Sequence, residues 1–223
     1  MKNEDSMIPL LFSGLGEEAE NALKSAGRLR KWHRGDLIVS EGDECKGLFL
    51  LMAGSAAEQK YTPAGDYSTI CLLHPGDCFG EELLYSEENK YASALEAVSE
   101  VEILCVPTEQ LFCLMESFPE IRENFHQVIA KRFRSLKQMI TILSQKTVRQ
   151  KIAYYLLTLA EEQGGDRVVL PVSKEVISKL LAIPRPSFSR ELSLMEAEGR
   201  ISISARTIGI ADMPSLKKDI GEV

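Results

Sequence analysis

Short apolar runs broken by turns occupy the chain from about residue 29 to residue 106. Runs of three to six residues lie at 37–39, 48–52, 69–73 and 101–106. Between them stand glycine-containing turn signals, at 34–36, 41–43, 53–54, 63–66 and 74–77. Turns that recur roughly every 8–12 residues are typical of an all-β sandwich or barrel. We therefore expect a β domain in this part of the chain.

On either side of this segment the apolar spacing lengthens to three or four residues, which predicts helices. A short amphipathic helix is expected over 15–30, and its apolar face is formed by Leu15, Ala19, Ala22, Leu23 and Ala26. After the β segment, Thr108 is a candidate N-cap for another helix. Pro119 suits the first turn of a long helix over 119–145, where its missing N–H costs nothing.

The long helix carries a regular apolar stripe. Its members, spaced 4-3-4-3 along the chain, are Ile129, Phe133, Leu136, Ile140 and Leu143. This spacing is that of the seam of a two-stranded coiled coil. The alternative is that the stripe packs on the chain's own core. Because a helix of this length between two domains has little else to cover it, we expect a homodimer interface along 119–145.

The C-terminal part predicts helix, tight turn, helix and hairpin. A helix over 147–163 ends at the breaker pair Gly164-Gly165, and 168–172 is a candidate strand. Ser173 then suits the N-cap of the next helix. The expected buried stripe of that helix is Val176, Ile177, Leu180 and Leu181. A turn at 182–184 leads to a further helix with Pro186 in its first turn, and 200–206 follows as a β-wing.

The helix that begins near Pro186 has two chemically different faces. Phe188, Leu192 and Met195 recur at intervals of four and three, so they are expected to face inward. The opposite face is formed by Pro186, Ser187 and Arg190. Arginine makes bidentate contacts with guanine O6 and N7, and serine can reach a phosphate. A solvated surface explains any single arginine, but the whole arrangement predicts reading of the DNA major groove.

Charge is distributed unevenly along the 223 residues. The net charge of −7 is divided into −9 over residues 1–144 and +2 over the remainder. Between Glu175 and Glu191 every charged residue is positive, namely Lys179, Arg185 and Arg190. An acidic first part is repelled by phosphates. Contact with nucleic acid is therefore expected only from the C-terminal part.

The segments RGDLI, EGD, LFLLMAG, HPGDCFGEELL, PRPSFSREL and LMEAEGRISI follow one another in an order that resembles the Crp/Fnr family, over nearly the full chain. The resemblance implies an α+β fold in three parts. Residues 1–118 would form a double-stranded β-helix (jelly-roll) barrel that senses an effector, 119–145 a dimerisation helix, and 146–223 a winged helix-turn-helix. The implied partners are a second copy of the chain, near-palindromic double-stranded DNA and RNA polymerase.

The resemblance also assigns residues to DNA contact. The expected set is Ser173, Lys179, Arg185, Pro186, Ser187, Ser189 and Arg190. By position, Arg190 matches the base-reading arginine of the family. Many members carry a glutamate where Pro186 stands, and glutamate accepts a hydrogen bond from cytosine N4 whereas proline cannot. The half-site is therefore expected to differ from theirs. Ala182 stands where glycine often makes the turn, at a cost of about 1 kcal/mol if its φ is positive.

An effector pocket is implied around the FGE turn. Its expected lining is Phe79, Gly80, Glu81, Glu82, Leu83, Tyr91 and Ala92. In members that bind cyclic nucleotides an arginine pairs with the cyclic phosphate, but Tyr91 takes that position here and Ala92 replaces its hydroxyl neighbour. A buried phosphate without a bidentate cation is poorly compensated. We therefore expect an effector other than cyclic AMP, with its identity and any cofactor unknown; the turn is alternatively a structural barrel corner.

Other classes of protein fit the sequence less well. A cupin-like metal enzyme needs converging His and carboxylate ligands, whereas His33, His74 and His126 are scattered. No cysteine precedes Cys45 and no CxxC occurs, which disfavours an iron–sulfur cluster. His74 is the one candidate for a haem ligand. A ligand-sensing module that signals through protein contacts remains an alternative. We expect a non-enzymatic protein without a metal.

Localisation is inferred from three features. No apolar run reaches the roughly 18 residues of a membrane span. The polar start of the chain lacks the pattern of a secretory signal. The five cysteines are an odd number and do not indicate a disulfide framework; most are expected to be buried packing residues, with Cys45 and Cys78 as candidate redox thiols. A cytoplasmic protein that does not enter a membrane is expected.

Overall fold

The computed structural model describes residues 9–221. They divide into two compact units that meet within one helix, between Arg134 and Ser135. The start of the chain, on which the absence of a secretory signal was argued, lies mostly outside the described residues. No described helix is both long enough and apolar enough to cross a membrane.

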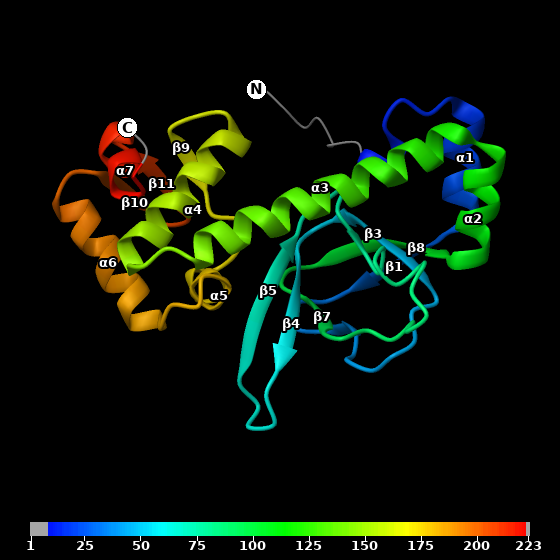
Figure 1. The fold of residues 1–223 in the computed structure, drawn as a ribbon, viewed down its shortest axis with the longest axis horizontal. Helices are drawn as coiled ribbons and strands as arrows, with labels where there is room; N and C mark the ends of the chain where they lie inside the picture. Colours follow the sequence, from blue (N-terminus) through cyan, green and yellow to red (C-terminus); the bar gives the residue numbers. More distant parts are fainter. Residues whose placement is uncertain (1–8, 222–223) are drawn as a thin grey trace. The chain divides into compact units, whose positions relative to one another are not determined.

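The first unit contains two antiparallel sheets of four strands each (Figure 1). One sheet has the order β1-β8-β3-β6, formed by Arg28–Trp32, Val101–Pro107, Gly47–Ala53 and Cys78–Phe79. The other has the order β2-β7-β4-β5, formed by Leu37–Val39, Ala94–Ala97, Ala56–Tyr61 and Tyr67–Leu73. The helices of this unit are the 3-10 turn η1 (Leu10–Phe12), α1 (Glu17–Ala26), α2 (Thr108–Ser117) and the first part of α3 (Pro119–Leu143).

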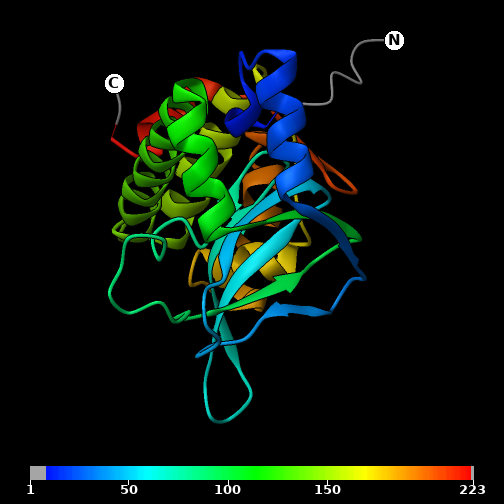
Figure 2. The ribbon, with the colours of Figure 1, turned by 90° about the vertical axis from the view of Figure 1, so that its right-hand side faces the viewer.

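Strand β8 shows why the unit has two apolar layers. Successive side chains of a strand point to opposite faces. Val101 and Ile103 join the core that also holds residues of the second sheet, such as Leu73. Leu104 and Val106 join a second core made with α1, α2 and α3. The first sheet is therefore covered on both faces, and Figures 1 and 2 show α1 and α2 together at one side of the strands.

Four expected strands occur near the predicted positions, but two helix expectations in this unit are wrong. The first helix ends at Ala26 instead of near residue 30, because Arg28 already pairs with Cys105 of β8. Between them, Gly27 lies so close to β8 that an added Cβ would be 2.6 Å from a Leu104 methyl carbon. Thr108 is not an N-cap, since Pro107 holds that position and Thr108 is the first helical residue.

The second unit surrounds a small sheet with helices. Its helices are the end of α3, α4 (Val148–Gln163), α5 (Lys174–Leu180), α6 (Arg185–Ala197) and α7 (Met213–Asp219). The sheet order is β10-β11-β9, from Ile201–Ser204, Thr207–Ile210 and Arg167–Val169. The strand expected over 168–172 is observed over 167–169; the Leu170 N–H still donates to the Arg206 carbonyl, but the next residue, Pro171, has no N–H to donate. As predicted, α4 stops at Gly164, whose φ is +70°.

The turn between α5 and α6 follows the Schellman pattern. The Ile183 N–H donates to the Ser178 carbonyl at 2.8 Å, and the Ala182 N–H donates to the Lys179 carbonyl at 3.1 Å. Ala182 holds the left-handed position of this motif, with φ +50°. The local geometry is thus the one that glycine favours, and alanine adopts it at a cost of about 1 kcal/mol.

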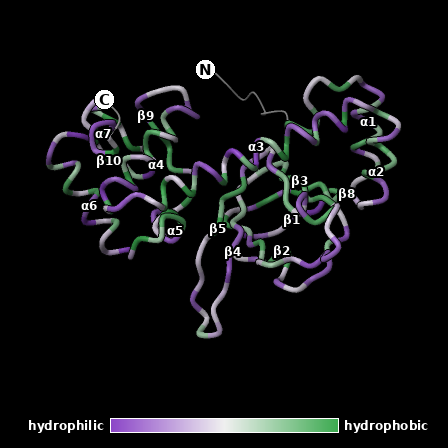
Figure 3. Tube along the Cα trace, in the orientation of Figure 1, coloured by the Kyte–Doolittle hydropathy of each residue, from purple (hydrophilic) through white to green (hydrophobic). Residues whose placement is uncertain are grey.

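Helix α3 exposes the predicted seam. Phe133 is 62% exposed and Ile140 is 67% exposed, large fractions for apolar side chains. The other three seam residues, Ile129, Leu136 and Leu143, are each 38–39% exposed. The same helix buries Ile121 and Phe125 in the first unit. Figure 3 shows hydrophilic and hydrophobic positions alternating along α3, as expected for a helix with both a buried and an exposed apolar face.

Candidate functional site

Helix α6 has the two faces that its sequence predicts. Phe188, Leu192 and Met195 are buried in the second unit. Arg185, Pro186 and Arg190 are exposed, and Ser187 is half-buried. Pro184 occupies the N-cap without any side-chain cap, so the first-turn N–H groups receive no side-chain acceptor from it. The helix therefore presents two arginines on a rigid, apolar-backed surface.

The other residues assigned to DNA contact lie on or beside this surface. Ser189 is half-buried and accepts a hydrogen bond from the Arg185 guanidinium one turn earlier. Ser173 is exposed and caps α5, where its hydroxyl accepts from the Val176 N–H at 3.3 Å. Lys179 is half-buried in the last turn of α5. Ser173 thus has a structural task of its own in addition to the predicted contact.

In the first unit, the FGE turn faces a tyrosine. The rings of Phe79 and Tyr91 stack with centroids 5.1 Å apart. The Tyr91 hydroxyl donates to the Cys45 sulfur at 3.2 Å. Gly80 has φ +91°, and a Cβ there would lie 3.0 Å from the Tyr91 hydroxyl. Tyr91 therefore packs into the wall of the turn, with no cationic group of its own to offer a phosphate.

A buried polar cluster lies next to this turn and is centred on Arg132 of α3. Its guanidinium donates to Glu58 Oε2 at 2.7 Å and to the Cys71 sulfur at 2.9 Å. Its Nε lies 3.4 Å from Glu81 Oε1. The Ser93 hydroxyl donates to the other Glu58 oxygen at 2.6 Å. Strands β4 and β5, the segment before β7, the FGE turn and α3 are therefore joined by one arginine.

Charge in this cluster is unbalanced, because one guanidinium faces two carboxylates. Burial, and then the charge of Glu82, raise the pKa of Glu81 to about 7 even though Arg132 lowers it. The second oxygen of Glu81, Oε2, is buried without a hydrogen-bond partner among the described residues, as is the Thr69 hydroxyl. Buried polar groups are nearly always paired, so these two atoms mark a place where a ligand group or a proton can be accommodated.

Among the described residues, the remaining predicted pocket residues form no hydrogen bond with the cluster, although the charge of Glu82 acts on Glu81. Glu82 and Ala92 are exposed, and Leu83 is half-buried. All five cysteines are free thiols, and Cys45, Cys71 and Cys78 are buried. Burial raises the pKa of the Cys78 thiol, which keeps it protonated. Among residues 9–221 no group of three or more His, Cys, Asp or Glu side chains is arranged to hold a metal ion.

Sequence reasoning missed Arg132, Glu58, Cys71 and Ser93 as site residues. The available signal was Glu58, a carboxylate that directly follows the small residues Ala56 and Ala57 between two turns. Glu58 and its neighbour Gln59 are both buried in β4. Arg132 directly precedes the seam residue Phe133, so its charge looked like part of an exposed helix surface.

Comparison with known proteins places these features in context. Residues 29–118 match the cyclic nucleotide-binding domain, and residues 150–219 match the Crp-like helix-turn-helix domain. A cyclic AMP receptor protein from Thermus thermophilus is 27% identical over 208 residues, which span 93% of this chain and 95% of that protein. A Crp-family transcriptional regulator of the same species, of known structure, is 26% identical with a TM-score of 0.68, over 87% of this chain and 97% of the other. A CooA mutant from Carboxydothermus hydrogenoformans has the same fold, with 18% identity and a TM-score of 0.79 over 98% and 97% of the two chains.

Proposed function

Because the chain belongs to the Crp/Fnr family of transcriptional regulators, which are not enzymes, we propose that it acts as a homodimer that reads a near-palindromic DNA site under the control of an effector sensed in its β domain. The observation that carries the DNA-reading part is α6, whose exposed Arg185 and Arg190 are backed by the buried Phe188. Arginines on such a helix make bidentate contacts with guanine in the major groove.

The dimer is supported by the five exposed apolar side chains of α3. Their heptad-like spacing lets a second copy of the helix cover them in a coiled coil. Two recognition helices then meet successive major grooves of one site, which explains a near-palindromic operator. A cytoplasmic location and contact with RNA polymerase belong to the same proposal.

Control by an effector is supported by the place of Arg132. Its guanidinium contacts Glu58 and Glu81 of the β domain, and it directly precedes the seam residue Phe133 in the chain. A ligand that competes for Glu58 or Glu81 alters the ion pairs of Arg132, and hence the helix that forms the dimer. Differential binding to two helix arrangements is what a population shift requires.

Cyclic AMP is expected to bind only weakly. Tyr91 stands where a phosphate-pairing arginine is needed, and the nearby Arg132 already pairs with Glu58 and Glu81. An anionic phosphate in this cluster meets two carboxylates and one engaged cation, which is unfavourable in a buried setting. Isothermal titration calorimetry of the dimer with cyclic AMP should show no submicromolar binding. A submicromolar dissociation constant would contradict the assignment of Tyr91.

DNA reading is tested by selecting binding sites for the unmodified protein, Arg190→Ala and Lys179→Ala. Losing a bidentate guanine contact costs about 1–3 kcal/mol and relaxes the preference at that base pair. Lys179 lies on α5, outside the reading helix, so Lys179→Ala should weaken all sequences alike and flatten the salt dependence slightly. The assignment is wrong if Arg190→Ala retains the original sequence preference, or if Lys179→Ala changes it.

A third variant in the same selection, Pro186→Glu, tests the departure from the family. A glutamate there should create a preference for a cytosine that the natural protein ignores. An unchanged preference would mean that position 186 does not face the base edges. If the unmodified protein selects no sequence at all, the alternative of a module that signals through protein contacts is favoured.

A further inference from the structure

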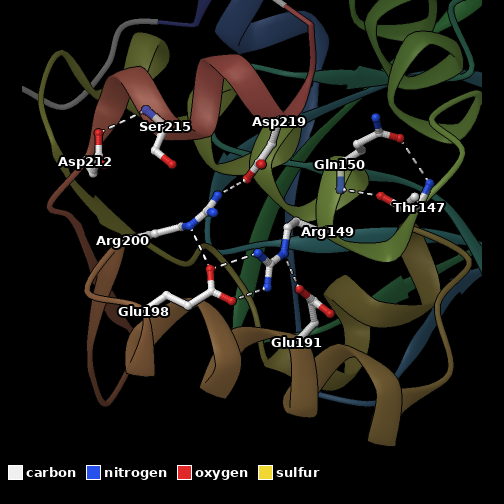
Figure 4. A network of polar contacts seen from close by, with 9 residues as sticks. All are labelled: Thr147, Arg149, Gln150, Glu191, Glu198, Arg200, Asp212, Ser215 and Asp219. Carbon is white, nitrogen blue, oxygen red and sulfur yellow. Dashed lines mark hydrogen bonds and ion pairs between the residues drawn. The ribbon is translucent and has the colours of Figure 1, made fainter.

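Helix α6, the proposed recognition helix, is ion-paired with Arg149, an arginine to which the sequence pattern assigned no role. Arg149 lies in the first turn of α4, and its guanidinium bridges Glu191 of α6 and Glu198, which caps the C-terminus of α6 (Figure 4). Its Nε lies 2.6 Å from Glu191 Oε1. Its two terminal nitrogens lie 2.8 Å from the two oxygens of Glu198. Such a fork-to-fork contact fixes direction as well as distance.

The contact continues to the C-terminal helix of the unit. Glu198 also accepts from Arg200 Nε at 2.7 Å, and Arg200 in turn pairs with Asp219 of α7 at 2.7 Å (Figure 4). The other glutamate of α6, Glu196, accepts from the Ile203 N–H of the wing at 2.7 Å. The two glutamates of α6 and its C-cap Glu198 therefore tie the helix to α4, α7 and β10.

Arg149 lies in the first turn of α4, and a capping box fixes the backbone there. Thr147 and Gln150 form a capping box at the start of α4, in which each side chain accepts from the backbone N–H of the other. This fixes the backbone on both sides of Arg149. The Arg149 side chain is 26% exposed and Glu191 is 18% exposed, whereas Glu198 is 39% exposed, so solvent screens the contact with Glu198 more than the contact with Glu191.

From this geometry we infer that Arg149 is a positioning residue for DNA reading, which sets the rotation of α6 and neutralises Glu191 beside Arg190. The inference rests on the proposed function of α6. Rotation matters because Arg185 and Arg190 reach base edges only when their face is turned to the groove. Neutralisation matters because an uncompensated carboxylate next to Arg190 repels the phosphates and competes for its guanidinium.

Two variants separate these effects. Arg149→Lys keeps the positive charge but cannot bridge both glutamates. It should therefore retain non-specific DNA affinity and lose about tenfold in the ratio of specific to non-specific affinity, the size of one bidentate base contact. Arg149→Gln should lose this ratio and non-specific affinity together. Adding Glu191→Gln and Glu198→Gln to Arg149→Gln should restore the non-specific affinity alone.

The ratio is the informative readout because simple unfolding lowers specific and non-specific binding equally. Arg167→Gln is the matched control, since Arg167 is exposed on β9 and its removal changes charge by the same amount without touching α6. It should leave the ratio unchanged. A folded Arg149→Lys protein with the unmodified ratio overturns the inference while the proposed function stands. If the unmodified protein shows no specific binding in the same titration, both fail.

Discussion

Phe133→Asp is expected to convert the protein into monomers and to lower its affinity for an intact operator by about a hundredfold or more. Phe133 is the second of the five seam residues of α3 and is 62% exposed, and in the proposed dimer a second copy of the helix covers this exposed surface. An aspartate there places two like charges in the apolar centre of a coiled coil. Loss of the dimer also removes the gain in effective concentration that links the two half-sites, which amounts to about 10²–10⁴.

Sedimentation velocity measures the first effect and titration of operator DNA the second. Gln127→Asp is the control, because residue 127 is exposed on α3 outside the seam and receives the same new charge. It should remain dimeric with full affinity. The prediction fails if the unmodified protein is already monomeric at micromolar concentration, or if Phe133→Asp sediments as a dimer.

The second large effect is expected from Arg132→Met. This change leaves the buried carboxylates of Glu58 and Glu81 without their common cation. Removing one partner from a buried ion pair costs about 3–5 kcal/mol. Trp32, the one tryptophan of the chain, lies in β1 of the same unit, so its fluorescence during urea unfolding reports on this unit directly.

The loss of stability expected for Arg132→Met depends on pH, and the pKa of Glu81 determines the direction of this dependence. In the unmodified protein the pKa of Glu81 is raised from its ordinary value of 4.5 to about 7, so folding favours the protonated carboxyl. Its stabilising contribution is present below pH 4.5 and is lost as the pH rises through 7. The deficit of Arg132→Met should accordingly be larger at pH 8 than at pH 6, because Glu81 is charged at the higher pH.

Two further variants make the result specific. Arg134→Met removes an exposed arginine two residues away and should change the unfolding free energy by no more than about 0.5 kcal/mol. Adding Glu58→Gln and Glu81→Gln to Arg132→Met should recover most of the loss, since neutral amides do not need the cation. Equal losses in Arg132→Met and Arg134→Met, or a loss independent of pH, would show that the buried cluster does not hold α3 to the strands.

Local periodicity predicted those elements whose buried positions can be recognised from the spacing of nearby apolar residues in the sequence. The apolar positions of α6 and the seam of α3 recur every three or four residues, and one helix surface suffices to explain each. Strand β4 was missed because Glu58 and Gln59 look like surface residues in a local pattern. Both are buried, and Glu58 is paired there with Arg132, which is 74 residues away and comes from another element.

The buried and exposed faces of α6 were predictable for the same reason, whereas the ion pairs that support the helix were not. Arg190 is recognised from the residues that surround it in α6 and from the family it resembles. The bridge from Arg149 to Glu191 spans 42 residues, and neither residue has an unusual local setting. A pairing of this kind depends on the packing of α4 against α6, which periodicity alone does not supply.

The divided burial of α3 has a consequence for the order of assembly. Ile121, Phe125 and Val128 are buried in a core shared with the strands of the same chain, whereas Phe133 is 62% exposed. Asn124 adds two hydrogen bonds, to the carbonyls of Leu11 and Ser13. The first half of the helix is thus fixed by intrachain contacts that form at any protein concentration. In the proposed dimer, folding of the β domain therefore precedes pairing, and a newly synthesised chain presents a preformed helical surface to its partner instead of an unfolded segment.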